Sequence, residues 1–213
     1  MAIKPIKPEH IQRLLIRSTN WIGDAVMTTP AVRAIRKRFP NTHISLLAKS
    51  WVVPVFKNSE HIDRLLIYDD EGRHKGIFGK FRLARDLKKY HFDAAILLQN
   101  AFEAALITFL AGIPIRIGYN TDVRQLLLTH AVSCTNEIKK KHQTDYYLDI
   151  IRGIGMEEDN RELYLKLNQR DRFRAGKILL EQHLSLDDKI VGINPGATYG
   201  PAKQWPLDRY ARL

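Results

Sequence analysis

The fold is decided by the stretch RLLIRSTNWIGDAVMTTP, which occupies residues 13–30. Its apolar run Leu14-Leu15-Ile16 is typical of a strand buried on both faces, as in parallel sheets. A short polar turn with one glycine, Gly23, follows, and residues 25–39 then carry apolar side chains at close to helical spacing. The stretch therefore predicts a buried strand that turns sharply into a helix, in which Pro30 marks either the start of the regular part or a kink. The turn lacks the G-x-G-x-x-G glycines of a dinucleotide-binding fingerprint.

The same alternation of strand and helix continues along the chain. Apolar runs predict further strands at residues 43–48, 64–68, 93–98, 115–118 and 163–167. Amphipathic or apolar segments predict helices at residues 51–56, 78–90, 101–111 and 142–154, while residues 126–132 read as extended but ambiguous. This order predicts the α/β fold class, with a parallel sheet covered by helices on both faces.

The pattern restarts near residue 167. A helix is predicted at residues 171–183, a strand at 189–193 and a glycine- and proline-rich loop directly after it. A single parallel strand needs neighbours to cover its backbone groups and faces. We therefore predict a complete Rossmann-like domain over residues 1–167 and the incomplete beginning of a second one over residues 168–213.

The chain is strongly basic, with a formal net charge of +11 and a pI near 9.8. Such a charge fits nucleic acid, an anionic membrane surface or an acidic small substrate. Nucleic acid is the weaker of these alternatives, because no zinc-ligand spacing and no RNP-like aromatic motif is present. One cysteine and no secretory signal fit a reducing compartment, and the most apolar segment, residues 104–115, is too short to span a bilayer. We expect a soluble, cytoplasmic protein.

The loop GINPGATYGPAKQWP, residues 192–206, is the second stretch whose residues could bind a ligand. It follows a predicted strand, and ligands of open α/β sheets bind at the carboxyl ends of strands. Gly196 would let backbone amides approach a ligand, Thr198 and Tyr199 offer hydroxyls, and Lys203 offers a positive charge. Together these residues could hold a phosphate or diphosphate. The alternative is an ordinary strand-to-helix loop with a surface lysine.

Both stretches resemble signatures of one family. G-A-x-Y-G-P-A-K-x-W-P near the end and N-W-I-G-D-A-V-M-T-T-P near the start, in this order, resemble the ADP-heptose:lipopolysaccharide heptosyltransferases, most closely the heptosyltransferase II type. The resemblance implies a GT-B-like architecture of two facing Rossmann-like domains, with residues 1–167 on the acceptor side and residues 168–213 starting the nucleotide-sugar-binding domain. Longer members exist in this family, so we expect the sequence to stop within the second domain.

The resemblance also implies roles for individual residues. The aspartate of the first motif, Asp24, is the expected catalytic base, which takes a proton from the acceptor hydroxyl. Lys203 is expected to stabilise the charge that develops on the departing ADP. Residues contacting substrates are expected at two places: Asn20, Trp21 and Gly23 near the acceptor, and Gly196, Thr198 and Tyr199 near the donor. Without the resemblance, an acidic residue in the first turn of a helix is the favoured interpretation of Asp24.

The expected reaction is an inverting transfer of heptose from ADP-heptose to the anionic heptosyl-Kdo-lipid A inner core, in lipopolysaccharide biosynthesis. No cofactor and no metal are expected, because His, Asp and Glu do not cluster at ligand spacing. The basic charge suits peripheral contact with the cytoplasmic face of the inner membrane, and no nucleic-acid partner is expected. Two alternatives stay open: a truncated, inactive chain that only binds the anionic acceptor, and a basic nucleotide- or nucleic-acid-binding α/β protein.

Overall fold

The computed structural model describes residues 6–185, 187–196 and 204–212. The chain divides into two compact units, Met1–Lys166 and Leu167–Leu213, and each is described here by itself. This division lies next to residue 167, where the sequence pattern restarts. Whether the second unit is the beginning of a Rossmann-like domain stays a prediction.

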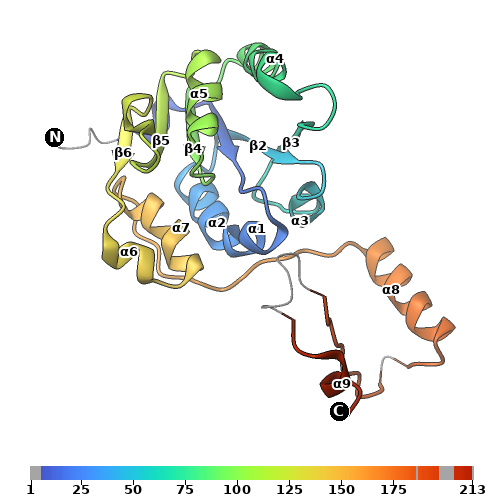
Figure 1. Cartoon of the computed structure of the whole chain (residues 1–213). Coiled ribbons are helices and arrows are strands. Elements are labelled where there is room, and N and C mark those ends of the chain that lie inside the picture. Colours follow the sequence, from blue (N-terminus) through green and yellow to red (C-terminus); the bar gives the residue numbers. More distant parts are fainter. Residues whose placement is uncertain (1–5, 186, 197–203, 213) are drawn as a thin grey trace. The chain divides into compact units, whose positions relative to one another are not determined.

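The first unit is built on one six-stranded sheet with the strand order β3-β2-β1-β4-β5-β6 (Figure 1). Every pair of neighbouring strands is parallel. The central strand β1 is almost entirely buried, as its apolar run predicts. The strands are β1 (Arg13–Arg17), β2 (His43–Lys49), β3 (Arg64–Tyr68), β4 (Ala94–Leu97), β5 (Ile115–Tyr119) and β6 (His130–Val132).

Helices cover both faces of this sheet, so the expected α/β class with a parallel sheet is confirmed (Figure 1). On one face, Leu14, Ile16 and Ile96 pack in a core with residues of α1 (Ile22–Met27), α2 (Thr29–Arg38), α3 (Val53–Phe56) and α7 (Gln143–Arg152). On the other face, Leu15 and Leu47 pack with residues of α4 (Gly76–Lys88) and α5 (Phe102–Leu110). The short elements of the unit are η1 (Pro8–His10), η2 (Arg124–Leu126) and α6 (Asn136–Lys140).

The strand order contains a topological switch point between β1 and β4. From β1 the chain moves outward to β2 and β3, then returns to place β4 on the other side of β1. In open parallel sheets the loops that leave two such strands diverge at their carboxyl ends and open a crevice. Residues 18–21 after β1 and 98–101 after β4 therefore occupy the position at which this type of fold binds ligands.

The helix predicted over residues 25–39 is not continuous. The structure has two helices, α1 and α2, with Thr28 between them. The hydroxyl of Thr28 donates to the carbonyl of Ala25 at 2.6 Å, and the hydroxyl of Thr29 donates to that of Val26 at 2.7 Å. Pro30, which has no N–H, stands in the first turn of α2. Proline and two back-bonding threonines thus end one helix and start the next.

Three further segments differ from the secondary structure predicted from the sequence or add to it. The ambiguous residues 126–132 divide into the end of η2 and the short strand β6. Residues 163–167 form no strand, although the backbone of Tyr164 donates to the hydroxyl of Thr29. Helix α6, which the sequence analysis missed, starts at the cap residue Thr135, whose hydroxyl accepts from the amide of Ile138.

The second unit contains α8 (Gln169–Glu181) and the short α9 (Leu207–Tyr210). Asn168 caps α8 by accepting a hydrogen bond from the amide of Asp171. Residues 189–193 form no strand, and the described residues of this unit contain no strand that could pair with them. Trp205 contacts the ring of Tyr210 edge-on at 4.9 Å between centroids, with part of its surface exposed.

Candidate functional site at the carboxyl edge of the sheet

The loop after β1 is held in place by the last residue of that strand, Arg17. Its guanidinium is buried and donates from Nη1 to the carbonyl of Ser18 at 2.5 Å and from Nη2 to Oδ1 of Asn20 at 2.8 Å. The guanidinium also stands over the ring of Tyr68, 5.2 Å from its centroid. Burial lowers the pKa of Arg17 to about 10, and the nearby tyrosine and carboxylates oppose this shift. The sequence alone did not single out this residue.

Asn20 accepts hydrogen bonds from two side chains. Besides the bond from Arg17 to its side chain, its backbone carbonyl accepts a hydrogen bond from Nε1 of Trp51 at 2.9 Å. Trp51 in turn lies under the ammonium group of Lys49, 4.8 Å from the ring centroid, and Lys49 pairs with Asp70 at 2.6 Å. The carboxyl ends of β1, β2 and β3 are therefore tied together through side chains. Two hydrogen bonds thus hold Asn20 in the loop at the switch point.

Asp24 lies in the first turn of α1, immediately after this loop. Its side chain is half-buried, and within the described residues it makes no ion pair and accepts no side-chain hydrogen bond. Helix α1 contacts α7, where burial, together with the negative charge of Asp24, raises the pKa of the Tyr147 hydroxyl. A carboxylate that is close to the crevice and not neutralised by a cation is available to accept a proton.

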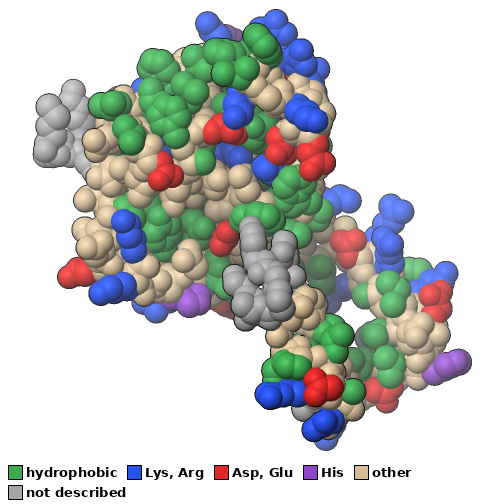
Figure 2. Space-filling view, viewed as in Figure 1, with side chains coloured by type: hydrophobic (Ala, Val, Ile, Leu, Met, Phe, Trp, Pro, Cys, Tyr) green, Lys and Arg blue, Asp and Glu red, His purple; other side chains and the backbone are tan. Residues whose placement is uncertain are grey.

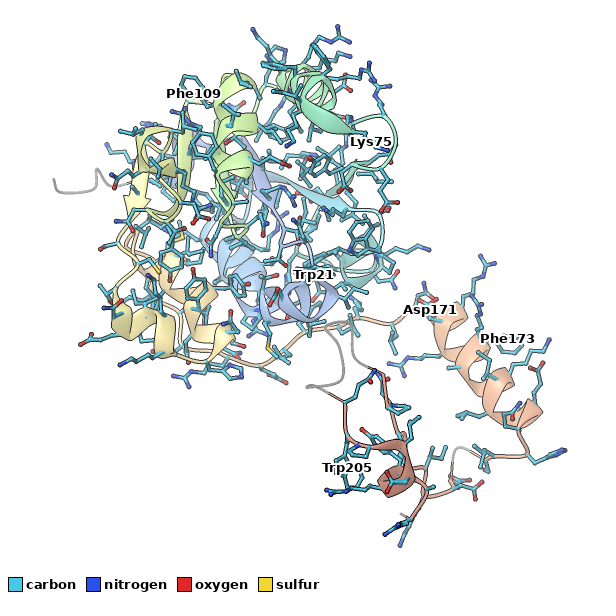
Figure 3. All side chains as sticks on the ribbon, in the orientation of Figure 1. Trp21, Lys75, Phe109, Asp171, Phe173 and Trp205 are labelled. Carbon is cyan, nitrogen blue, oxygen red and sulfur yellow. The ribbon has the colours of Figure 1, made fainter. Side chains whose placement is uncertain are left out.

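Gly23 and Trp21 form the exposed side of the same turn. A Cβ atom added to Gly23 would meet no atom within 4 Å, and no positive φ angle demands glycine there. A side chain at this position would therefore not clash with the rest of the protein. Its absence leaves open space beside the start of α1. The side chain of Trp21 is half exposed at the start of α1 (Figure 3). The four motif residues Asn20, Trp21, Gly23 and Asp24 thus lie at one edge of the sheet.

On the other side of the switch point, Arg124 fixes the loops after β4 and β5. Its fully buried guanidinium donates to the carbonyls of Tyr119 and Gln99 and to Oδ1 of Asn100, at 2.7, 2.5 and 2.8 Å. Burial lowers the pKa of Arg124 to about 10. The amide nitrogen of Asn100 then donates to the Tyr146 hydroxyl at 2.5 Å. Two buried arginines, Arg17 and Arg124, thus hold the loops on the two sides of the switch point.

A third connection runs along the α4 and α5 side of the edge. The Tyr68 hydroxyl donates to Oε1 of Glu103 at 2.5 Å, and Lys80 pairs with Oε2 of the same carboxylate at 2.6 Å. Burial of Glu103 opposes its ionisation, but the hydrogen bonds from Lys80 and Tyr68 outweigh this and lower its pKa. Glu103 stands in the first turn of α5, so this network joins β3, α4 and α5 where they meet the crevice.

The residues predicted to hold the donor belong to the second unit. Gly196 is exposed, and its amide donates to Oδ1 of Asn194 at 3.1 Å in a local turn. Thr198, Tyr199 and Lys203 lie outside the described residues. Their roles, and those of the first-unit residues as substrate contacts, remain predictions.

Two residues with a reactive side chain have structural roles instead. His142 caps α7, with Nδ1 accepting from the amide of Thr144 at 3.3 Å. Cys134 is a free thiol whose sulfur lies 3.8 Å from the Tyr146 hydroxyl. In the part of the chain that the structure describes, no group of three or more His, Cys, Asp or Glu side chains is placed to hold a metal ion.

Comparison with known proteins connects this geometry to a family. Residues 80–213 match the family described as glycosyltransferase family 9 (heptosyltransferase). The chain is 26% identical over 211 residues to lipopolysaccharide heptosyltransferase 2 of Escherichia coli (strain K12), covering 94% of this chain and 59% of that protein. It therefore spans about three fifths of the length of that curated relative.

Solved structures show the same fold. The chain superposes on the glycosyl transferase family 9 protein from Veillonella parvula DSM 2008 with a TM-score of 0.84 at 24% identity, covering 94% of this chain and 58% of that one. It also superposes on the E. coli ADP-heptose lps heptosyltransferase II with a TM-score of 0.74 at 23% identity, covering 94% and 59%. The expected GT-B-like α/β class is thereby confirmed.

Proposed function

Because the chain belongs to glycosyltransferase family 9, we propose that the protein of which it is part transfers heptose from ADP-heptose to the heptosyl-Kdo-lipid A inner core of lipopolysaccharide. The observation that carries the proposal is the half-buried carboxylate of Asp24 beside the switch-point crevice, with no cation paired to it among the described residues. The names of the two E. coli relatives, both heptosyltransferases, support the choice of sugar.

The proposed reaction is one direct displacement. A hydroxyl of the acceptor attacks the anomeric carbon of the heptose while Asp24 takes the hydroxyl proton. The new glycosidic bond forms as the bond between that carbon and the diphosphate oxygen breaks, so the anomeric configuration inverts. ADP leaves with the electron pair of that bond. We assign Lys203 and the amides around Gly196 to stabilising the charge that develops on the diphosphate.

On the acceptor side, we assign Asn20, Trp21 and Gly23 to the surface that receives the inner-core sugar. The open space beside Gly23 supports close approach of a sugar to the backbone, and the side-chain brace on Asn20 supports a fixed binding geometry. Thr198 and Tyr199 are assigned to the donor. The reaction as proposed needs no cofactor, since the bond changes require only a proton acceptor and stabilisation of the leaving group.

We further propose that the protein works at the cytoplasmic face of the inner membrane, where it would meet a lipid-linked acceptor. Among the described residues, no helix is both long and apolar enough to cross a bilayer. The net charge of +11 supports contact with an anionic surface or an anionic acceptor. Family membership disfavours the alternative of a nucleic-acid-binding protein.

The test is heptose transfer from ADP-heptose to purified heptosyl-Kdo-lipid A. The 213-residue chain is compared with a version extended to the length of its relatives, and each is compared with its Lys203→Ala variant. We expect transfer by the extended protein and a large loss in its variant, because the leaving diphosphate loses a cation. Transfer by neither protein would refute the proposal. If the extended protein transfers heptose and the 213-residue chain only binds the acceptor, the shorter chain is an acceptor-binding part of the protein.

A further inference from the structure

Helix α4 is apolar on two sides. Gly79, Leu83, Ala84 and Leu87 are buried on the side that faces the sheet. On the opposite side Ile77, Phe78 and Phe81 are 66%, 81% and 52% exposed. Three large apolar side chains within the first two turns of one helix form an apolar cluster, and such clusters on a protein surface usually mark a contact site.

Basic residues continue the exposed side of the same helix. At 100° per residue, positions 77, 81, 85 and 88 fall on one stripe, and positions 78 and 82 lie beside it. The stripe therefore runs from Ile77 and Phe81 to Arg85 and Lys88, all of them exposed. We call the six residues Ile77, Phe78, Phe81, Arg82, Arg85 and Lys88 the α4 face. Figure 2 shows hydrophobic and basic side chains together over the region in which Figure 1 places α4 and α5.

Acidic side chains do not compensate this charge. The helix contains one, Asp86, and its carboxylate pairs with Arg73 at 2.6 Å and with Lys89 at 3.1 Å. The α4 face therefore presents apolar groups and positive charges together. This combination is typical of helices that lie at the surface of an anionic bilayer, with aromatic and aliphatic groups at the level of the headgroups and lysine and arginine beside the phosphates.

The apolar end of α4 is rigidly placed at the edge that holds the candidate site. The helix follows β3, so its first turns lie at the carboxyl edge of the sheet. Lys80 ties those turns to Glu103 of α5, beside Phe102, which is itself exposed. An acceptor anchored in a membrane would reach Asn20 and Asp24 from this same edge. This last step rests on the proposed function, whereas the surface chemistry does not.

We propose that the α4 face docks on a bilayer that contains anionic phospholipids, with Ile77, Phe78 and Phe81 entering the headgroup region. Arg85 and Lys88 then lie against lipid phosphates. The contact would hold the carboxyl edge of the sheet next to the membrane surface, where a lipid-linked acceptor is presented.

The experiment is flotation of the full chain with vesicles of phosphatidylglycerol and phosphatidylethanolamine, or of phosphatidylcholine alone. We expect binding to the anionic vesicles that weakens as salt is added, because exposed charges are screened. The triple variant Ile77→Ser, Phe78→Ser, Phe81→Ser should bind them about tenfold more weakly, since apolar area no longer enters the interface. The double variant Arg85→Glu, Lys88→Glu should lose the preference for anionic lipid.

The matched control is Leu126→Ser with Phe173→Ser, which removes two large apolar side chains that are 80% and 76% exposed elsewhere on the chain. It should bind like the unchanged protein. Absence of vesicle binding, or equal losses in the control and the triple variant, would overturn the proposal. So would a triple variant that binds vesicles normally but loses self-association, because the occupant would then be a second copy. The vesicles contain neither donor nor acceptor, so the result is independent of heptose transfer.

Discussion

Nη2 of Arg17 donates to Oδ1 of Asn20 at 2.8 Å, so a buried cation at the end of β1 shapes the loop that leads to Asp24. The same guanidinium holds the carbonyl of Ser18. A planar group with several donors can hold both acceptors at once, whereas an ammonium group is a single point of charge. The geometry of the candidate site therefore depends on a residue that does not itself reach the open crevice.

Arg17→Lys should lower kcat/KM for heptose transfer by about tenfold or more, because lysine cannot hold Ser18 and Asn20 together and the loop shifts. The charge is kept, so the urea midpoint of unfolding should change much less than in Arg17→Ala. The measurement is steady-state transfer in the extended protein alongside urea unfolding. Unchanged transfer in the lysine variant would show that the loop does not need this brace.

Asp24→Asn should lower kcat by a factor of about 100 to 10,000, the usual contribution of a positioned base. Its stability should stay close to that of the unchanged protein, because the described structure gives this carboxylate no ion pair that the amide would lose. Rapid-quench measurement of heptose transfer, with circular dichroism as the check on folding, tests both statements. Glu137→Gln, in the first turn of α6, is the matched control and should leave turnover unchanged. Near-normal turnover in Asp24→Asn would remove this residue as the base.

Gly23→Ala should not lower the thermal midpoint of unfolding, because alanine favours the helix in which Gly23 lies, and it should raise KM for the acceptor several-fold. The added methyl group meets no surrounding segment within 4 Å, so it can clash only with a ligand. Gly79→Ala is the opposite control, because its Cβ would lie 2.1 Å from the backbone carbon of His74 and the fold should suffer. Equal KM values in Gly23→Ala and the unchanged protein would mean that substrate does not approach this turn.

The Asp86 carboxyl should make the protein more stable above pH 4 than at lower pH. Burial opposes its ionisation, but hydrogen bonds from Lys89 and Arg73 outweigh that effect and lower its pKa to about 2, below the value of about 3.9 expected in the unfolded chain. The stabilisation is therefore fully present above the unfolded pKa and is lost as the pH falls towards 2. Its size should be only about 1 kcal/mol, because both cations are largely exposed to solvent.

Urea unfolding of Asp86→Asn across this pH range provides the check. The variant should be less stable than the unchanged protein by a constant amount above pH 5, and the difference should shrink between pH 4 and pH 2. A difference that stays constant down to pH 2 would contradict the assigned pKa.

Much of the sheet could be predicted from the sequence, because a strand buried on both faces leaves a continuous apolar run. Leu14-Leu15-Ile16 is such a run, and the structure places it inside β1. Pro30 indicated a start or a kink within this helix, but the break at Thr28 itself was not predicted, because it depends on two threonine hydroxyls that bond back to the preceding turn. The expected strand at 189–193 failed for the opposite reason: its residues favour a strand, but pairing requires a neighbour.

The candidate site was predictable only in part. The motif around Asp24 and Gly23 could be found because its residues are adjacent in the chain. Arg17 gave a weak signal, an arginine directly after a buried apolar run. Arg124 and Asn100 gave none, because the bond between them joins residues 24 positions apart and exists only once β4 and β5 lie side by side. Hydrogen bonds between residues that are distant in the chain leave no pattern in the local sequence.

The central position of β1 also has a consequence for synthesis on the ribosome. β1 is made first, yet the residues that meet its second edge follow 80 positions later, as in the bond from the Arg13 amide to Asp93. At roughly 5–20 residues per second, that edge stays unpaired for about 4–16 s after it is made. During this interval an apolar strand with unpaired backbone groups is exposed. The nascent chain should therefore depend on chaperones more than the native fold alone would indicate.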